Sequence, residues 1–343
     1  MASEEHPAST TIPSEPKPSP RPASEAKKQP PADRSHEASY QQSSFLHKYL
    51  AYQARRLDRL LVRLSTLLAS PTSTDALLGT LCYTLELLAA LLSRFLNHRL
   101  TSLASTIAEK ADRVLLPGET LVTTIPTTAS DKILAQVLAS SKALAAVIAD
   151  YRIFVRLWGL AGLYMWARST WNTPVAKEEG TKAKVVRRIT WAQIASLILF
   201  QVLENGVYLA SKGVLTSSGW SGEAGKSREI RWWVWSSRFW AVHVALELVR
   251  VTALKYYGNQ EDKTEQEKAL VADGEKEGKL LVDEKKKERW TWWRDAVSNI
   301  AYMPMTLHWS VDEDNGFLSD WGVGVLGAIA GGSLLVDVWK QTA

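Results

Sequence analysis

Residues 45–68 have the sequence FLHKYLAYQARRLDRLLVRLSTLL. If this stretch is helical, its leucines recur at intervals of three, four and seven residues and share one face. We call this face the leucine ridge. Its members are Leu46, Leu50, Leu57, Leu60, Leu61, Leu64 and Leu68. The spacing predicts an amphipathic helix.

Basic residues accompany the leucine ridge along one flank, and Asp58 is the only acidic residue of the stretch. These basic residues are Lys48, Arg55, Arg56, Arg59 and Arg63. Leucines can sink into the acyl layer of an anionic membrane while arginines stay among the lipid phosphates. The pattern therefore predicts membrane insertion by the leucines and phosphate contact by the basic residues. The alternative is that the ridge packs against another helix of the same chain.

The composition of the 343 residues also favours a membrane surface. The net charge of +5 is mild, so it indicates attraction to acidic lipid and not a nucleic-acid surface. Fifteen tryptophans accompany only six phenylalanines, and tryptophan is typical of the boundary between a bilayer and water. The single cysteine, Cys82, excludes an internal disulfide and a cysteine metal cluster.

The chain divides by composition into five parts. Residues 1–44 hold eight of the thirteen prolines and almost no apolar residue, which is typical of a disordered tail. We expect 45–174 to be helical, 175–254 to be an apolar helical hairpin in the membrane, 255–289 to be a charged linker and 290–343 to be a tryptophan- and glycine-rich membrane segment. The predicted fold is an all-α membrane protein in which amphipathic and apolar helices form a membrane-associated bundle.

Particular segments carry these expectations. Residues 75–100 and 131–171 each predict one long helix, and 189–211 is long enough to cross a hydrocarbon layer of about 30 Å. The last apolar segment, 321–336, contains Gly327 and Gly331 at the small-xxx-small spacing that lets two helices approach closely in lipid. We therefore predict that these two glycines pack against a helix.

Catalytic motifs are absent from the sequence. It contains no Walker-type glycine loop, no His-Glu-x-x-His, no nucleophile elbow and no cysteine pair. The six histidines are not spaced as metal ligands. We therefore expect a non-enzymatic protein with no catalytic residue, no metal site and no cofactor.

Several stretches, in this order along the chain, resemble the peroxin-eleven family of peroxisomal membrane elongation factors. They are YRIFVRLWGL at 151–160, ENGVYLA at 204–210, WSSRFW at 235–240, residues 299–310, and VWK at 338–340. The resemblance runs from about residue 75 to residue 340. The proline-rich start and the charged linker are similar to the fungal C-type branch of the family.

This resemblance implies a protein of the peroxisomal membrane, integral or tightly associated. In the family, an amphipathic helix inserts into one leaflet, so that the organelle elongates and divides. The resemblance also implies homo- or hetero-oligomers with family members, recruitment of fission machinery and no nucleic-acid partner. Because 45–68 precedes the resembling part, 75–100 and 144–160 are alternatives for the inserting helix. Arg152 and Arg156 are predicted to contact lipid phosphate as well.

Two other functions remain open from the sequence. In the first, the segments 189–254 and 317–339 oligomerise into a pore for small metabolites, with Glu204, Arg238 and Glu247 facing a wet lumen. In the second, the protein is a membrane-anchored adaptor whose tail and charged linker recruit partners.

Overall fold

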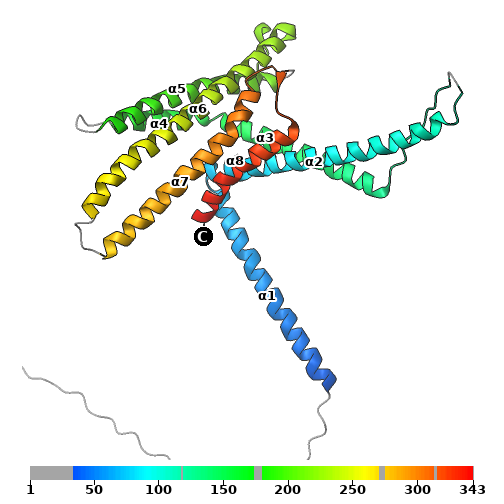
Figure 1. Cartoon of the computed structure of the whole chain (residues 1–343), viewed down its shortest axis with the longest axis horizontal. Helices are drawn as coiled ribbons and strands as arrows, with labels where there is room; N and C mark the ends of the chain where they lie inside the picture. The colour runs from blue at the N-terminus through cyan, green and yellow to red at the C-terminus, as the bar shows by residue number, and fades with distance from the viewer. Residues whose placement is uncertain (1–33, 117–118, 174–179, 270–274, 313–314, 343) are drawn as a thin grey trace, which may run out of the picture. The chain divides into compact units, whose positions relative to one another are not determined.

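The computed structural model contains eight α-helices, one short 3-10 helix and no strand in the residues that it describes (Figure 1). The predicted all-α fold is confirmed. Residues 1–33 of the predicted tail lie outside the described part. The described residues are 34–116, 119–173, 180–269, 275–312 and 315–342, and their side chains are described except in 34–46 and 259–282.

The chain divides into two compact units, residues 1–59 and 60–343. Helix α1 (Arg34–Leu68) contributes to both, because the boundary falls within it. It begins before the predicted start at residue 45. In the first unit only α1 is described, and the second unit contains the last turns of α1 and all the other helices.

Helices α2 (Pro71–Asp112) and α3 (Ala129–Arg156) begin at local signals in the sequence. Pro71 lies in the first turn of α2, where its missing N–H removes no helical hydrogen bond. At the start of α3, the Thr128 hydroxyl accepts a hydrogen bond from the Asp131 N–H at 3.2 Å. The Asp131 carboxylate accepts one from the Thr128 N–H at 3.0 Å, which completes a capping box.

The single helix predicted for 131–171 is wrong, because α3 ends at Arg156 and α4 (Gly159–Asn172) follows as a separate helix. The Asn205 side chain donates a hydrogen bond to the Leu157 carbonyl at 3.1 Å, next to this break. A Cβ at Gly159 would lie 2.7 Å from the Gln201 side-chain oxygen. Both contacts come from α5, so the break depends on tertiary packing that a local pattern does not reveal.

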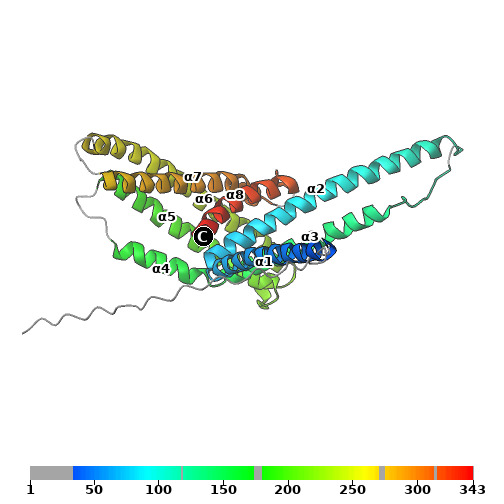
Figure 2. The ribbon, with the colours of Figure 1, turned by 90° about the horizontal axis from the view of Figure 1, so that it is seen from below.

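Four antiparallel helices follow. Helix α5 (Thr181–Ser211) leads through the 3-10 turn η1 (Ser218–Trp220) to α6 (Gly222–Ala269). Helices α7 (Glu275–His308) and α8 (Asp320–Gln341) complete the chain. Helices α5 and α6 lie side by side (Figures 1 and 2).

The segment 255–289, predicted as a charged linker, is helical for most of its length, because α6 continues to Ala269 and α7 begins at Glu275. Its acidic and basic residues include pairs spaced four apart, such as Asp283 and Lys287. Opposite charges at this spacing support a helix even where few apolar residues are available.

Neighbouring helices of the second unit pack in a continuous series. Helix α3 packs on α2, α2 on α8, α8 on α7, α7 on α6 and α6 on α5, and α3 also contacts α5. Fully buried side chains such as Met305, Ile194 and Val207 lie in this packing. In the described residues, α2, α3, α5 and α8 are long and apolar enough to cross a membrane.

Candidate membrane-insertion surface

The leucine ridge of α1 is exposed. Leu50, Leu57 and Leu61 expose 61%, 57% and 55% of their surface. Leu60 and Leu68 are also exposed, whereas Leu64 is half-buried and the side chain of Leu46 lies outside the described part. Large exposed aliphatic side chains that gather on one helix face are typical of an interaction surface.

The basic residues of α1 cover its polar face and do not form one flank. At about 100° per residue, Arg56 and Arg63 border the ridge, whereas Lys48, Arg55 and Arg59 fall on the opposite side. Four of the five basic residues are exposed, namely Lys48, Arg55, Arg56 and Arg59. The cationic side chains therefore lie around the ridge on the part of the helix that would face headgroups and water.

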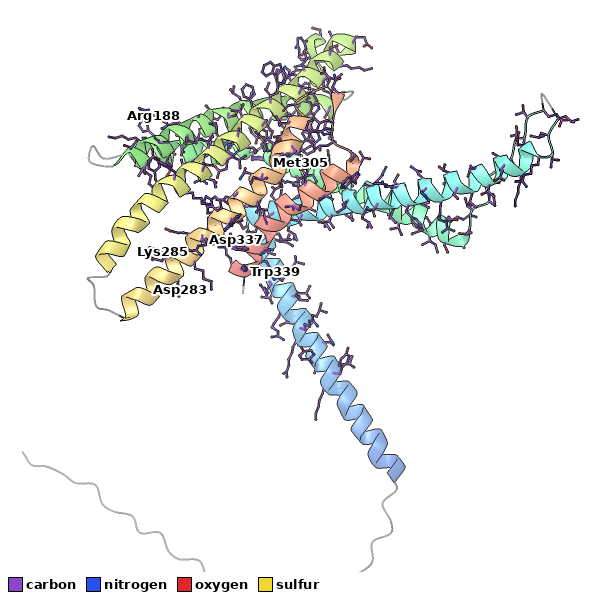
Figure 3. The ribbon with its side chains drawn as sticks, in the orientation of Figure 1. Arg188, Asp283, Lys285, Met305, Asp337 and Trp339 are labelled. Atoms are coloured by element: carbon purple, nitrogen blue, oxygen red, sulfur yellow. The ribbon has the colours of Figure 1, made fainter. Side chains whose placement is uncertain are left out.

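Arg63 differs from the other basic residues because it binds the last turn of α8. Its guanidinium donates to the Trp339 carbonyl at 2.6 Å and to the Thr342 hydroxyl at 3.1 Å. It also stacks over the Trp339 ring at 4.2 Å from the ring centroid. Figure 3 labels Trp339 at this end of α8. Arg63 therefore joins the end of α1 to the C-terminal helix.

Leu67 lies one turn after Arg63 on α1 and was not among the predicted ridge residues. It is completely buried, although the neighbouring Leu68 is half exposed. The Thr74 hydroxyl donates to the Leu68 carbonyl at 3.2 Å, which ties the end of α1 to the start of α2. In the sequence, Leu67 is one more leucine in a leucine-rich stretch, so no local signal distinguishes it.

Arg152 and Arg156, predicted to contact phosphate, are each engaged by a carboxylate of another helix. Arg152 donates to both oxygens of Asp75 on α2, at 2.7 and 3.2 Å. Arg156 donates to both oxygens of Glu204 on α5, at 2.9 Å each. The second pair is largely buried, with the Glu204 side chain only 6% exposed. These arginines therefore join helices.

The glycines of α8 lie against α2 of the same chain. A Cβ at Gly327 would lie 2.2 Å from the Tyr83 ring, and a Cβ at Gly331 would lie 2.8 Å from the Thr80 hydroxyl. Gly324 was not among the predicted glycines, but a Cβ at this position would likewise lie only 2.7 Å from the Leu87 backbone. The missing side chains let the two helices approach closely.

The three charged residues assigned to a pore lumen each have a partner in the chain. Glu204 is paired with Arg156. Glu247 accepts hydrogen bonds from Gln193 at 2.6 Å and from Arg250. Arg238 donates to the Ser310 carbonyl at 3.0 Å.

Glu247 belongs to a larger polar network that no sequence pattern predicted. We call it the ion-pair ladder. Arg250 of α6 lies 3.7 Å from Asp295 of α7, Asp295 pairs with Arg294, and Arg294 reaches Asp337 of α8 at 2.5 Å. The Trp290 indole also donates to Asp337 at 3.0 Å. The only sequence signal for this network is the presence of charges inside otherwise apolar segments.

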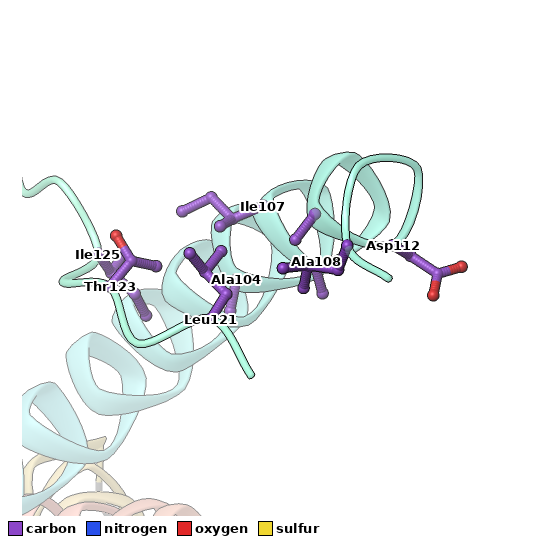
Figure 4. Close-up of a pocket in the computed structure, with 9 residues that line it drawn as sticks. Ala104, Ile107, Ala108, Asp112, Leu121, Thr123 and Ile125 are labelled. Atoms are coloured by element: carbon purple, nitrogen blue, oxygen red, sulfur yellow. The ribbon is translucent and has the colours of Figure 1, made fainter. Parts of the chain in front are cut away.

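A pocket lies near the C-terminal end of α2, where residues 121–125 run beside the helix (Figure 4). Its lining is mostly apolar and includes Ala104, Ile107 and Leu121. The Asp112 carboxylate points away from this apolar cluster (Figure 4). Among the described residues, no group of His, Cys, Asp and Glu side chains is arranged to hold a metal ion.

Residues 173–339 match the family described as Peroxisomal biogenesis factor 11 (PEX11). This part of the chain belongs to the PEX11 family. The predicted family is confirmed, and the chain is a protein of the peroxisomal membrane with a role in peroxisome proliferation and membrane remodelling. The fungal C-type branch stays a prediction.

One curated relative of this PEX11 protein is a Schizosaccharomyces pombe protein described as uncharacterised. The two are 29% identical over 192 residues, which cover 55% of this chain and 73% of the relative. No solved structure matches the chain.

The PEX11 match contains α5, α6, α7 and nearly all of α8, and therefore the whole ion-pair ladder. Helix α1 and the leucine ridge precede the matched residues. The candidate insertion surface and the family region are thus different parts of one chain. Arg63, in the part of α1 that belongs to the second unit, contacts the last turn of α8.

Proposed function

We propose that this PEX11 protein elongates the peroxisomal membrane by inserting the leucine ridge of α1 into one leaflet. The observation that supports the proposal is the exposure of Leu50, Leu57 and Leu61 on a helix whose polar face is basic. Each buried CH₂ contributes about 0.8 kcal/mol to insertion. The arginines stay at the depth of the lipid phosphates.

Insertion of α1 widens one leaflet relative to the other, and this asymmetry favours positive curvature. Curvature needs a wedge that stays in one leaflet. The apolar helices of the second unit would anchor the chain in the bilayer, and the contacts of Arg63 and Leu67 would hold the end of α1 at that anchor. No catalytic step or cofactor is part of this function.

Two further parts of the proposal concern partners. We propose that the protein forms homo- or hetero-oligomers with family members and that it recruits fission machinery to the elongated membrane. What supports these parts is the coarser role in peroxisome proliferation and membrane remodelling that the PEX11 match gives. The lumen residues of the pore function, Glu204, Arg238 and Glu247, bind partners within the chain, so we do not favour a pore.

The test compares two double substitutions in the full-length protein. Leu57→Asp with Leu61→Asp places two charges on the ridge. Tyr52→Asp with Val62→Asp places the same two charges on the polar side of α1, at residues that are equally exposed. The measurement is peroxisome length in cells that lack the endogenous protein.

We expect the ridge variant to leave peroxisomes short and the polar-side variant to elongate them as the unmodified protein does. The proposal is wrong if both variants elongate peroxisomes normally. It is also wrong if both lose elongation equally, because the effect would then not depend on the ridge.

A further inference from the structure

Tryptophans and basic residues gather at one end of helices α5 to α8. The Trp292 indole of α7 donates to the Val251 carbonyl of α6 at 2.9 Å. Lys255 stacks over Trp292 at 4.2 Å, and Lys340 stacks over Trp290 at 3.6 Å. We call this set the first girdle. Its members are Trp191, Lys255, Trp290, Trp292, Trp293, Trp339 and Lys340.

A second girdle lies at the opposite ends of the same helices. Trp309, which directly follows α7, stacks on Trp240 just inside this girdle with 5.7 Å between ring centroids, and the Arg238 guanidinium lies 4.8 Å from the Trp235 ring. Trp220 of η1 packs against Trp232 at 4.9 Å. The members of the second girdle are Trp220, Trp232, Trp235, Arg238, Trp309 and Trp321. Tryptophan and basic residues together are typical of membrane–water interfaces.

The spacing between the girdles matches a bilayer. At 1.5 Å per residue, Trp321 to Trp339 on α8 spans about 27 Å. Trp290 to Trp309, the residue directly after α7, spans about 29 Å. Trp235 to Lys255 on α6 spans about 30 Å by the same rise. The hydrocarbon core of a membrane is about 30 Å thick. Helices α6 and α7 thus have the same girdle spacing as the apolar helix α8.

The side chains exposed between the girdles are apolar on all four helices. Among the described residues of 192–210, 239–251, 294–308 and 322–339, no charged or polar side chain is in the exposed class. The exposed residues are Ala192, Ala195, Ile198, Leu199, Val202, Val242, Val249, Val297, Ile300, Leu307, Ile329 and Val336. Such a surface fits acyl chains.

The ion-pair ladder explains how α6 and α7 can share this environment. By length and composition alone, α6 and α7 are not among the helices apolar enough to cross a membrane in the described part of the chain. However, each of the four charged residues of the ladder on these helices contacts a neighbouring helix. Glu247 accepts from Gln193 of α5, Arg250 of α6 lies near Asp295 of α7, and Arg294 pairs with Asp337 of α8. Within their own helices, Arg250 also pairs with Glu247 and Arg294 with Asp295. Charged residues inside a membrane are tolerated when they face the bundle interior and pair with one another.

We propose that α6 and α7 cross the membrane together with α5 and α8, so that the PEX11 region is a four-pass bundle bound by lipid headgroups at both girdles. This inference does not depend on the proposed function of α1. The rival arrangement has two passes, α5 and α8, with α6 and α7 on the membrane surface. The two arrangements differ in the side on which residues 255–289 lie.

Cysteine labelling on intact peroxisomes distinguishes the arrangements. In the full chain with Cys82→Ala, a single cysteine replaces one of three exposed residues, Gly180, Ser217 or Asp283. Gly180 directly precedes α5, Ser217 directly precedes η1, and Asp283 lies early in α7. A membrane-impermeant maleimide is applied before and after permeabilisation. The Cys82→Ala chain alone is the control and is expected to stay unlabelled.

Both arrangements place Gly180 and Ser217 on opposite sides. If α6 crosses the membrane, the chain returns to the side on which Gly180 lies before α7 begins. We therefore expect Asp283→Cys and Gly180→Cys to be labelled under the same condition, and Ser217→Cys under the other. Labelling of Asp283→Cys together with Ser217→Cys would overturn the inference in favour of two passes. Equal labelling of all three on intact organelles would overturn it because the bundle would not cross the membrane. Peroxisome length is not the readout, so neither result tests the role of the ridge.

Discussion

At the scale of single residues, the pair of Arg156 and Glu204 is the clearest test of what holds the helices together. Its carboxylate is buried, so replacing Glu204 with Gln leaves the guanidinium without its counter-charge. Because the Arg156 side chain is 33% exposed, losing this half-buried pair costs about 1–3 kcal/mol, less than for a fully buried pair. We expect Glu204→Gln to lower the unfolding temperature of the purified protein in detergent.

The matched control is Glu109→Gln. Glu109 pairs with Arg113 on the same helix, and both side chains are largely exposed. Exposed pairs contribute about 0–1 kcal/mol, so this change should leave the unfolding temperature almost unaltered. Equal losses in the two variants would show that burial of the Arg156 pair does not matter.

At the scale of elements, the close approach of α8 to α2 depends on glycine. A leucine at Gly327 would overlap the Tyr83 ring, whereas a Cβ at Gly332 would enter open space with no atom of another helix within 4 Å. Overpacking of this kind costs about 1–3 kcal/mol. We therefore expect Gly327→Leu, but not Gly332→Leu, to lower the unfolding temperature and to increase protease cleavage of the purified protein.

Both substitutions place the same side chain on the same helix, so a difference between them reports packing and not helix propensity. If Gly332→Leu were as damaging as Gly327→Leu, the α2–α8 contact would not be the cause.

At the scale of the whole molecule, Arg63 lies in the last turns of α1, which belong to the second unit, and contacts the last turn of α8 there. Arg63→Met removes its hydrogen bonds to the last turn of α8 but keeps an unbranched apolar side chain. If α1 acts as a wedge held at the membrane anchor, this variant should stay in the carbonate-resistant membrane fraction and elongate peroxisomes less. Arg59→Met is the control, since Arg59 is exposed and its guanidinium donates only to the Arg55 carbonyl of its own helix.

If Arg63→Met elongates peroxisomes normally, the contact of Arg63 with α8 is not needed for elongation by the leucine ridge. Loss of the protein from the membrane fraction would instead assign Arg63 to anchoring. Either result is read from the same fractionation and the same images of peroxisome length.

The sequence by itself determined the helical class, the approximate places of most helices and the amphipathic character of α1. These features depend on spacings of three and four residues and on local signals such as Pro71, which act within one element. The family resemblance also came from the sequence, through several short stretches in a fixed order.

Only the tertiary structure decided which charges are paired. Arg156 and Glu204 lie 48 residues apart, and Arg294 and Asp337 lie 43 apart, so no local pattern distinguishes them from arginines that face lipid phosphate. The break before Gly159 likewise depends on Gln201 and Asn205 of α5. The physical reason is that a charge or a helix break inside an apolar bundle is stable only when a distant group supplies its partner, and folding alone brings that partner close.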